Sequence, residues 1–332
     1  MIEPKRLEEI KEGIVGKKIM VLGDMMLDGY FWGGVSRISP EAPVPVVELD
    51  EEFYRFGGAA NVANNLAHLQ TEAVPVGIIG DDEYGEIFKR LLHKEKINSD
   101  GILIDKTRPT TTKIRVIADK QHVVRIDKET KEEISEETEK RIIDYIVSRI
   151  REIDAIILQD YNKGIFTKSL IGKVIEIANS ENKIVTVDPK FLNFFEYKNV
   201  TVFKPNRHET ATALGIKISG EEDLIFAGKE LLKRLNSQYV LLTLSEEGIA
   251  LFEKGKDNFV RIPTKARKVA DVSGAGDTVI ATLTASLAAG ATIEEAAYLA
   301  NYAGGIVCEE VGIVPVELEN LFNQAKVTSE RK

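Results

Sequence analysis

The chain has 332 residues, of which 43% are hydrophobic and 29% charged, a balance typical of a globular protein with a sizeable core. Its net charge of -9 argues against a nucleic-acid partner, because phosphate backbones favour basic surfaces. The sequence contains neither an apolar run of about 18 residues nor an apolar signal-peptide core, so we expect a cytoplasmic protein with no membrane association. The single cysteine, Cys308, excludes an internal disulfide and a cysteine-cluster zinc site.

The first half of the chain alternates between predicted helices and strands. An amphipathic helix with Leu7, Ile10 and Ile14 on one face opens the chain, and the apolar run 18–22 predicts a buried strand. Residues 30–50 combine several prolines with β-forming residues, which favours a small separate sheet over a central strand. The remaining segments are predicted as helices at 59–69, 84–94 and 136–152, strands at 73–80 and 155–158, and a hairpin at 111–127.

The second half continues this alternation and defines the fold class. Helices are predicted at 169–179, 275–289 and 293–308, and strands at 184–187, 201–203, 239–244 and 250–252. This rhythm predicts an α/β fold with a doubly wound, mainly parallel sheet flanked by helices, plus a small β-sheet lid from about 30–50 and 111–127. Because no linker or repeat divides the chain, we expect one domain at 1–325 and a C-terminal tail at 326–332. Ligands in such folds bind beyond the carboxyl ends of the strands.

The sharpest local motif is Asp271-Val272-Ser273-Gly274-Ala275-Gly276-Asp277, directly before a predicted helix. Its small residues let successive backbone N–H groups face one anion, and the helix dipole adds positive potential. An aspartate beside bound phosphate makes chemical sense if Asp277 takes a proton from an attacking hydroxyl while Gly274, Ala275 and Gly276 stabilise the transferring phosphoryl group. The alternative is an ordinary glycine-rich helix start. The sequence contains neither a complete Rossmann fingerprint nor a GxxxxGK[ST] loop.

Four ordered motifs between about residues 18 and 316 resemble those of the PfkB, or ribokinase-like, family of carbohydrate kinases. The string 274–277 is similar to the C-terminal signature of the family, and 57–63 to its N-terminal signature. The resemblance implies that Asp277 is the catalytic base, that ATP and Mg²⁺ are required, and that the phosphate acceptor is a sugar. It implies a sugar site that includes Asp24, Asp28, Gly57, Gly58 and Asn61, and an element at Asn206 and Glu209 that acts on Mg²⁺, through water, and on the nucleotide phosphates.

Each of these motifs also has a purely structural interpretation. Gly57-Gly58 could form a tight turn beside a closely packed helix. Asn206 and Glu209 have the spacing of an N-cap and the third helical residue, although capping and function can coexist. Asp24 and Asp28 could be solvated loop charges.

The segment 34–46 is similar to the lid of the heptose 7-phosphate kinase subgroup of this family, and Ser245 stands where many relatives have glycine. That resemblance implies transfer of the ATP γ-phosphoryl group to the anomeric hydroxyl of a sugar that already carries a phosphate. Such a substrate requires cations at the sugar site. The candidates are Arg37, Lys113, Arg115 and Lys190, and Asp160 is a further site candidate that could instead belong to a solvated turn.

The resemblance extends to the nucleotide, to partners and to competing functions. It implies that Thr243, Ser245, Gly248 and Asn301 line the nucleotide site. The proline-rich lid strands expose a sheet edge that pairing in a homodimer would protect. The sequence has no HxGH motif, so we expect ADP-heptose formation to need a separate adenylyltransferase. The alternatives are a kinase for ribose, fructose or fructose 6-phosphate, and a non-catalytic sugar or nucleotide sensor.

Overall fold

A large β-sheet forms the centre of the computed structural model, which describes residues 2–119, 121–264, 272–310 and 312–330. Its strands are β1 (Lys18–Gly23), β4 (Glu72–Gly80), β5 (Ile102–Asp105), β8 (Ala155–Gln159), β9 (Ile184–Asp188), β10 (Val202–Phe203), β11 (Tyr239–Thr243), β12 (Ile249–Glu253) and β13 (Val260–Ile262). Within the described residues their order in the sheet is β13-β12-β11-β10-β9-β8-β1-β4-β5. The strands from β5 to β11 pair in parallel, whereas β12 pairs antiparallel with both β11 and β13. The predicted doubly wound, mainly parallel sheet is confirmed.

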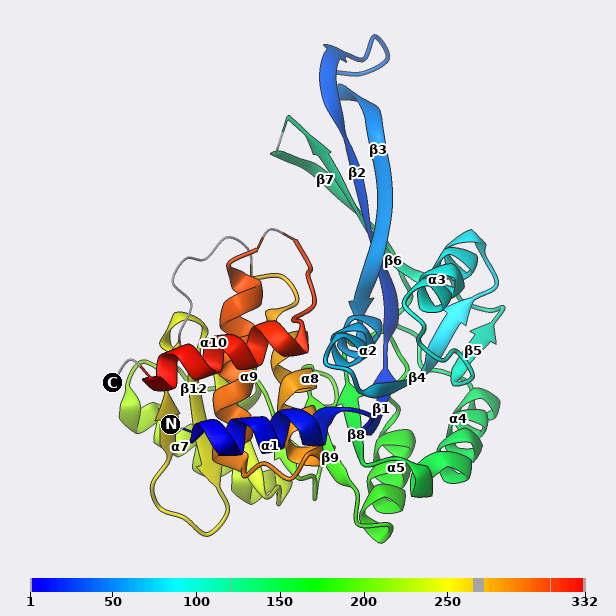
Figure 1. The fold of residues 1–332 in the computed structure, drawn as a ribbon. Helices are drawn as coiled ribbons and strands as arrows, with labels where there is room; N and C mark the ends of the chain where they lie inside the picture. Colours follow the sequence, from blue (N-terminus) through cyan, green and yellow to red (C-terminus); the bar gives the residue numbers. More distant parts are fainter. Residues whose placement is uncertain (1, 120, 265–271, 311, 331–332) are drawn as a thin grey trace.

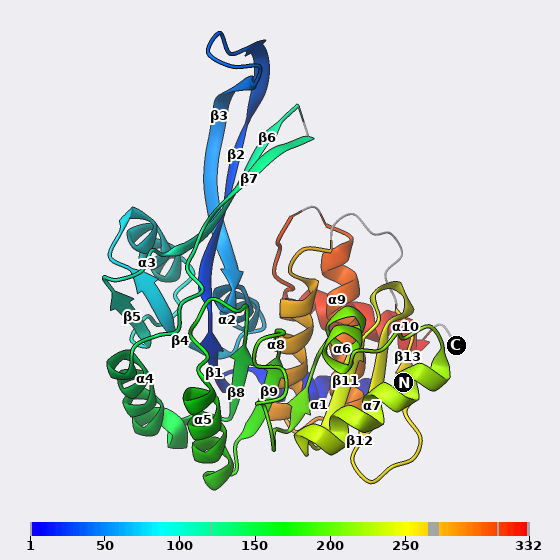
Figure 2. The same cartoon turned by 180° about the vertical axis from the view of Figure 1, so that it is seen from behind.

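Helices cover both faces of this sheet and form two hydrophobic cores. The side chains of β1 alternate between them: Ile19 and Val21 join one core, and Met20 and Leu22 join the other. The first core includes α1 (Pro4–Ile14), α2 (Ala59–His68), α3 (Glu83–Lys94), α8 (Ala275–Ala288), α9 (Ile293–Cys308) and α10 (Leu318–Glu330) (Figure 1). The second core includes α4 (Glu136–Arg149), α5 (Lys168–Ser180) and α7 (Glu221–Leu235), which Figure 2 shows from behind.

The lid is a separate four-stranded sheet that projects from the body (Figure 1). Its order is β3-β2-β6-β7, and the strands are β2 (Met25–Ile38), β3 (Pro45–Gly58), β6 (Thr111–Ala118) and β7 (Gln121–Lys128). The hairpins β2–β3 and β6–β7 are antiparallel, whereas β2 and β6 pair in parallel. The first lid strand, β2, begins at Met25 and is separated from the end of β1 by one residue, so the base of the lid adjoins the carboxyl edge of the main sheet.

Several elements were not predicted from the sequence. The omitted elements are β5, β13, α7, α10 and the short 3₁₀ turn η2 (Ser245–Glu247). The start of α6 (Arg207–Leu214) was given only as the structural alternative for the motif at residues 206–209, and the 3₁₀ turn η1 (Ile150–Glu152) ends the segment predicted as one helix at 136–152. The boundary expected at residue 325 falls inside α10, which packs against α1 through the pairs Lys11–Glu319 and Lys326–Glu8. No helix within the described residues is both long enough and apolar enough to cross a membrane.

The two-core arrangement predicts that central strand residues dominate stability. Leu22 has an exposed fraction of 0%, so we expect Leu22→Ala to lower the free energy of unfolding by about 2–5 kcal/mol in urea denaturation. The matched control is Val15→Ala, because Val15 is 52% exposed, and its effect should stay within about 0.5 kcal/mol. Equal losses in the two variants would contradict the assignment of Leu22 to a packed core.

Candidate active site

The carboxylate of Asp277 lies at the start of α8, where it meets the carboxyl ends of the central strands. Its exposed fraction is only 4%. Oδ1 accepts hydrogen bonds from Gln159 Nε2 (3.0 Å) at the end of β8 and from the hydroxyl of Tyr161 (2.7 Å), and Oδ2 accepts one from Asn61 Nδ2 (2.8 Å) on α2. Three neutral donors from different segments therefore fix the position of this carboxylate.

Burial raises the pKa of Asp277 to about 6, well above its ordinary value of 3.8. The hydrogen bonds from Asn61 and Tyr161 oppose this rise because they stabilise the ionised form; nearby Asp188 raises the pKa further, and Lys204 lowers it. A carboxylate with this pKa is mostly ionised at neutral pH and more basic than an exposed aspartate. That combination suits a general base.

An ion pair between Asp188 and Lys204 lies beside Asp277. Lys204 Nζ is 2.8 Å from Asp188 Oδ2, and both side chains are buried. Gln159 Nε2 lies 3.3 Å from the same Asp188 oxygen, so it bridges the two aspartates. These three residues come from separate segments of the chain, and their pairing was not predicted from the sequence.

The turn before α8 leaves two backbone amides available. Gly274 adopts a φ of +80°, a left-handed conformation that favours glycine, and a Cβ there would lie 3.1 Å from Asn61 Nδ2. The Ala275 amide bonds back to the carbonyl of Val272. Among the described residues, no backbone carbonyl accepts the amides of Gly276 and Asp277, which leaves them available to an anion at this helix start. Asp271, the first residue of the motif, lies outside the described residues.

Asp24, which the resemblance assigns to the sugar site, anchors a loop in the structure. Its carboxylate accepts the amides of Tyr161 (2.8 Å), Lys163 (3.1 Å) and Ile165 (3.4 Å). Burial and the nearby Asp160 raise the pKa of Asp24 to about 7 against the effect of these bonds. Asp160 is also buried, and it accepts bonds from Tyr197 Oη (2.7 Å) and from the Asn162 amide (2.7 Å).

Two glycines make room for Asp28 and for the start of α2. A Cβ on Gly57 would lie 2.5 Å from Asp28 Oδ2, so any side chain there would displace the aspartate. Gly58 precedes α2 with a φ of +56°, and a Cβ there would lie 2.6 Å from the Asp24 carbonyl oxygen. Gly57 therefore lets the Asp28 carboxylate approach the backbone closely, and Gly58 lets α2 begin against the backbone of Asp24.

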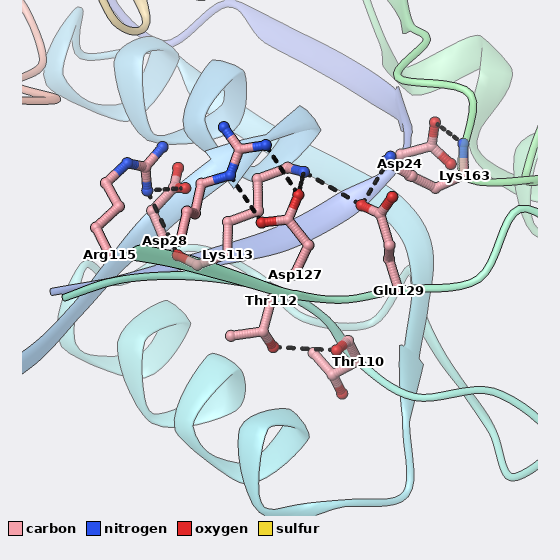
Figure 3. Close-up of polar contacts among 10 residues, drawn as sticks. Asp24, Asp28, Thr110, Thr112, Lys113, Arg115, Asp127, Glu129 and Lys163 are labelled. Atoms are coloured by element: carbon pink, nitrogen blue, oxygen red, sulfur yellow. Dashed lines mark hydrogen bonds and ion pairs between the residues drawn. The ribbon is translucent and has the colours of Figure 1, made fainter. Parts of the chain in front are cut away.

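A cluster of paired charges lies at the base of the lid (Figure 3). Arg115 Nη1 donates to Asp28 Oδ1 at 2.5 Å, and the guanidinium group stacks over the Tyr30 ring. Two lysines of the same region also pair with acidic residues. Lys113 pairs with Asp127 (3.1 Å) and Glu129 (3.2 Å), and Lys163 pairs with Glu129 (2.7 Å). The predicted cations Lys113 and Arg115 thus lie together near Asp28, and each already has an anionic partner.

Lys190 lies against the segment assigned to the nucleotide, although it was grouped with the sugar-site cations. It forms an ion pair with Glu209, and its Nζ lies 5.4 Å from the centre of the Tyr161 ring. Asn206 caps α6 by accepting the Glu209 amide (2.8 Å), and Glu209 Oε2 accepts the Asn206 amide (2.8 Å). The structure therefore contains the helix cap that the structural interpretation of this motif predicts. The Glu209 carboxylate pairs with Lys190 at the same time.

Three of the other residues predicted to bind the nucleotide lie at the end of β11 and in the segment that follows it, and the fourth lies on α9. Thr243 ends β11 and forms a bridge with Asn206, and Ser245 begins η2 with a φ of 54°. Gly248 follows η2, and its carbonyl accepts the Leu244 amide. Asn301, on α9, donates to the carbonyl oxygen of Pro263 at 2.8 Å.

Arg37 does not join this site in its own chain. It is an exposed residue near the far end of β2, where it pairs with Val46. About 40 Å of extended strand separates it from Met25 at the base of the lid. Of the predicted cations, Arg37 alone lies far along the lid.

Solved structures with known functions share this fold. Arabidopsis thaliana ribokinase complexed with ribose and ATP matches with a TM-score of 0.75 and 19% identity, covering 94% of this chain and 99% of that one. The tetrameric inhibited form of phosphofructokinase-2 from Escherichia coli matches with a TM-score of 0.76 and 17% identity, covering 95% and 100%. The fold is therefore ribokinase-like.

The family follows from sequence comparison. The pfkB family carbohydrate kinase profile matches residues 16–319, and the chain belongs to that family. It is 43% identical over 305 residues to the bifunctional protein HldE of Helicobacter pylori strain J99, covering 92% of this chain and 65% of the relative. HldE of Desulfatibacillum aliphaticivorans is also 43% identical, over 92% of this chain and 63% of its own length. The chain thus spans a little under two-thirds of these relatives.

The raised pKa of Asp277 predicts a pH-dependent stability difference. A carboxyl group whose pKa rises on folding stabilises the folded state at low pH, and this contribution is lost as the pH rises through the folded pKa. The unmodified protein therefore loses this contribution as the pH rises from about 4 to 7, whereas Asp277→Asn has no carboxyl group to titrate there. Over this range we expect the free energy of unfolding of Asp277→Asn to rise relative to that of the unmodified protein by on the order of 2–3 kcal/mol. Urea denaturation across this range measures the difference, and a pH-independent difference would contradict the burial argument.

Proposed function

We propose that this chain transfers the γ-phosphoryl group of ATP to the anomeric hydroxyl of D-glycero-D-manno-heptose 7-phosphate, giving heptose 1,7-bisphosphate. The observation that carries the transfer chemistry is the buried Asp277 carboxylate beside the available amides at the start of α8. Membership of the carbohydrate kinase family supports a sugar acceptor. The 43% identity to HldE and the resemblance of residues 34–46 to heptose kinase lids support the particular sugar.

In the proposed reaction, Asp277 accepts the proton of the anomeric hydroxyl as its oxygen attacks the γ-phosphorus and ADP departs. An anomeric hydroxyl is more acidic than an ordinary sugar hydroxyl, so a carboxylate with a pKa of about 6 is a sufficient base. The amides of Gly276 and Asp277 and the Lys204 ammonium supply positive potential for the transferring group. Positioning and charge stabilisation account for most of the acceleration.

Mg²⁺ bound with ATP would neutralise phosphate charge. The oxygens of Glu209 and Asn206 are the hard ligands that Mg²⁺ prefers, but the capping box and Lys190 already engage them. This arrangement fits contact through water rather than direct coordination. Nucleotide binding around Thr243, Ser245, Gly248 and Asn301 completes this side of the proposed site.

The phosphate already on the sugar needs cations, and the base of the lid supplies them. Lys113, Arg115 and Lys163 have side chains only 12–18% exposed, and all three pair with Asp28 or Glu129. A sugar phosphate that binds there replaces one anionic partner with another, so no cation is left unpaired in either state. Asp28 and Asn61 are the groups we assign to the sugar hydroxyls.

A substrate panel tests this function. We expect ADP release with Mg-ATP and heptose 7-phosphate to exceed that with fructose 6-phosphate, fructose, ribose or adenosine, with the new phosphate on the anomeric carbon by NMR. Asp277→Asn should lower turnover by about 10²–10⁴-fold, while Asp257→Asn, which alters a fully exposed carboxylate, should retain it. Preference for another sugar would overturn the acceptor. Nucleotide binding without ADP release on any sugar would favour the sensor instead.

We also propose that two copies pair through their lids. Apolar side chains lie exposed on the four-stranded sheet, among them Trp32 (44%), Val124 (50%) and Ile126 (51%). Analytical ultracentrifugation should therefore detect a dimer that Ile126→Glu dissociates. Val147→Glu, on α4 and 54% exposed in the chain, is the matched control and should leave the dimer intact. A monomer at micromolar concentration, or equal effects of both variants, would contradict pairing through the lids.

The proposed product requires a further nucleotidyl transfer to become an ADP-heptose. The 332 residues contain no HxGH motif. We therefore propose that adenylylation is performed by sequence outside these residues.

A further inference from the structure

The loop that follows β8 is tied to the protein by two buried aspartates. Asp24 accepts three of its amides, at residues 161, 163 and 165, and Asp160 accepts the hydroxyl of Tyr197. Asn162 and Gly164 adopt left-handed conformations, with φ of 55° and 88°. A short loop with this many fixed backbone groups holds the side chains it carries in one orientation.

This loop delivers the Tyr161 hydroxyl to the base. Tyr161 Oη donates to Asp277 Oδ1 at 2.7 Å, and Gln159, the last residue of β8, donates to the same oxygen at 3.0 Å. Oδ2 receives one donor, Asn61 Nδ2. A carboxylate oxygen has two lone pairs, so Oδ1 has both occupied whereas Oδ2 has one available. The two oxygens of Asp277 are therefore not equivalent as proton acceptors.

We propose that Tyr161 is a positioning residue that stabilises ionised Asp277 through Oδ1 and directs the proton of the acceptor hydroxyl to Oδ2, and that Asp24 acts through Tyr161 by holding its loop. The proposal rests on the kinase function proposed above. In the step, the hydroxyl O–H bond breaks, its proton moves to Oδ2, and its oxygen forms the bond to the γ-phosphorus of ATP as the bond to ADP breaks. Asp277 returns the proton to solvent after the product leaves.

The charges that face Asp277 come from several elements, and all of them bear on its titration. Asp188 at the end of β9 disfavours the ionised form, while Lys204 after β10 favours it. Lys190 interacts with Asp277 from the segment after β9, and its own partners include Glu209. Burial together with Asp277 raises the pKa of Tyr161 far above its ordinary value, so its hydroxyl remains a donor. Tyr161 is thus a neutral donor among these fixed charges.

Removal of the Tyr161 hydroxyl provides the test. Without the hydroxyl, ionised Asp277 loses a hydrogen bond and its pKa rises. In a plot of kcat against pH, we therefore expect Tyr161→Phe to move the acidic limb to higher pH by about one unit, with turnover recovering at alkaline pH. The matched control is Tyr54→Phe, which removes a hydroxyl bond of 2.6 Å to Glu52 on the lid strand β3 and alters neither a hydrogen bond to Asp277 nor an anchor of the loop. It should leave the limb in place. An unmoved limb in Tyr161→Phe, or an equal shift in both variants, would overturn the proposal.

The role of Asp24 is tested by combining substitutions. Asp24→Asn keeps the size of the side chain but weakens its acceptance of three amides, so it should move the limb in the same direction as Tyr161→Phe. If Asp24 acts through Tyr161, the double variant should show no shift beyond that of Tyr161→Phe. Additive shifts would mean that Asp24 acts on the base by another route.

A measurement without substrate separates this proposal from the kinase assignment. Protein labelled with ¹³C at aspartate carboxyl carbons gives a titration of Asp277, whose resonance is identified by its loss in Asp277→Asn. Tyr161→Phe should raise the titration midpoint, and Tyr54→Phe should not. If no sugar phosphate in the panel is turned over, the proposed function fails while this titration still decides whether Tyr161 stabilises the ionised base.

Discussion

A buried carboxylate must be kept ionised and correctly oriented, and much of the structure around Asp277 meets that constraint. Its exposed fraction of 4% makes ionisation costly, and its pKa of about 6 reflects that cost. Donors from α2, the end of β8 and the following loop offset part of the cost. Because each donor comes from a different segment, the active geometry depends on the packing of helices against the whole sheet.

Paired charges organise the rest of the site in the same way. Lys204 pairs with Asp188, Lys190 with Glu209, and Arg115 with Asp28. A protein with a net charge of -9 would attract the two phosphorylated ligands that we propose only through local cations, and pairing keeps these cations in place before a ligand arrives. In the proposed exchange of a carboxylate partner for a phosphate, each cation also stays paired when the ligand binds.

The strands and the turn before α8 could be predicted from the sequence because their signals are local. Continuous apolar runs marked β1 and β8, and the small residues before Asp277 marked the turn. The helices α7 and α10 were missed although their apolar spacing is regular, while β13 has only three residues and carries little signal. The partners of Asp277 were not predictable, because Tyr161 lies 116 residues away in the chain and only the fold joins the two.

The most direct test of the account is a crystal structure with heptose 7-phosphate and a non-hydrolysable ATP analogue. The account predicts that the anomeric oxygen lies within hydrogen-bonding distance of Asp277 Oδ2, about 2.6–3.2 Å, with the γ-phosphate beside the start of α8. An anomeric oxygen bound instead to Asp24 or Asp28, with Asp277 remote from both ligands, would contradict the assignment of Asp277 as the base.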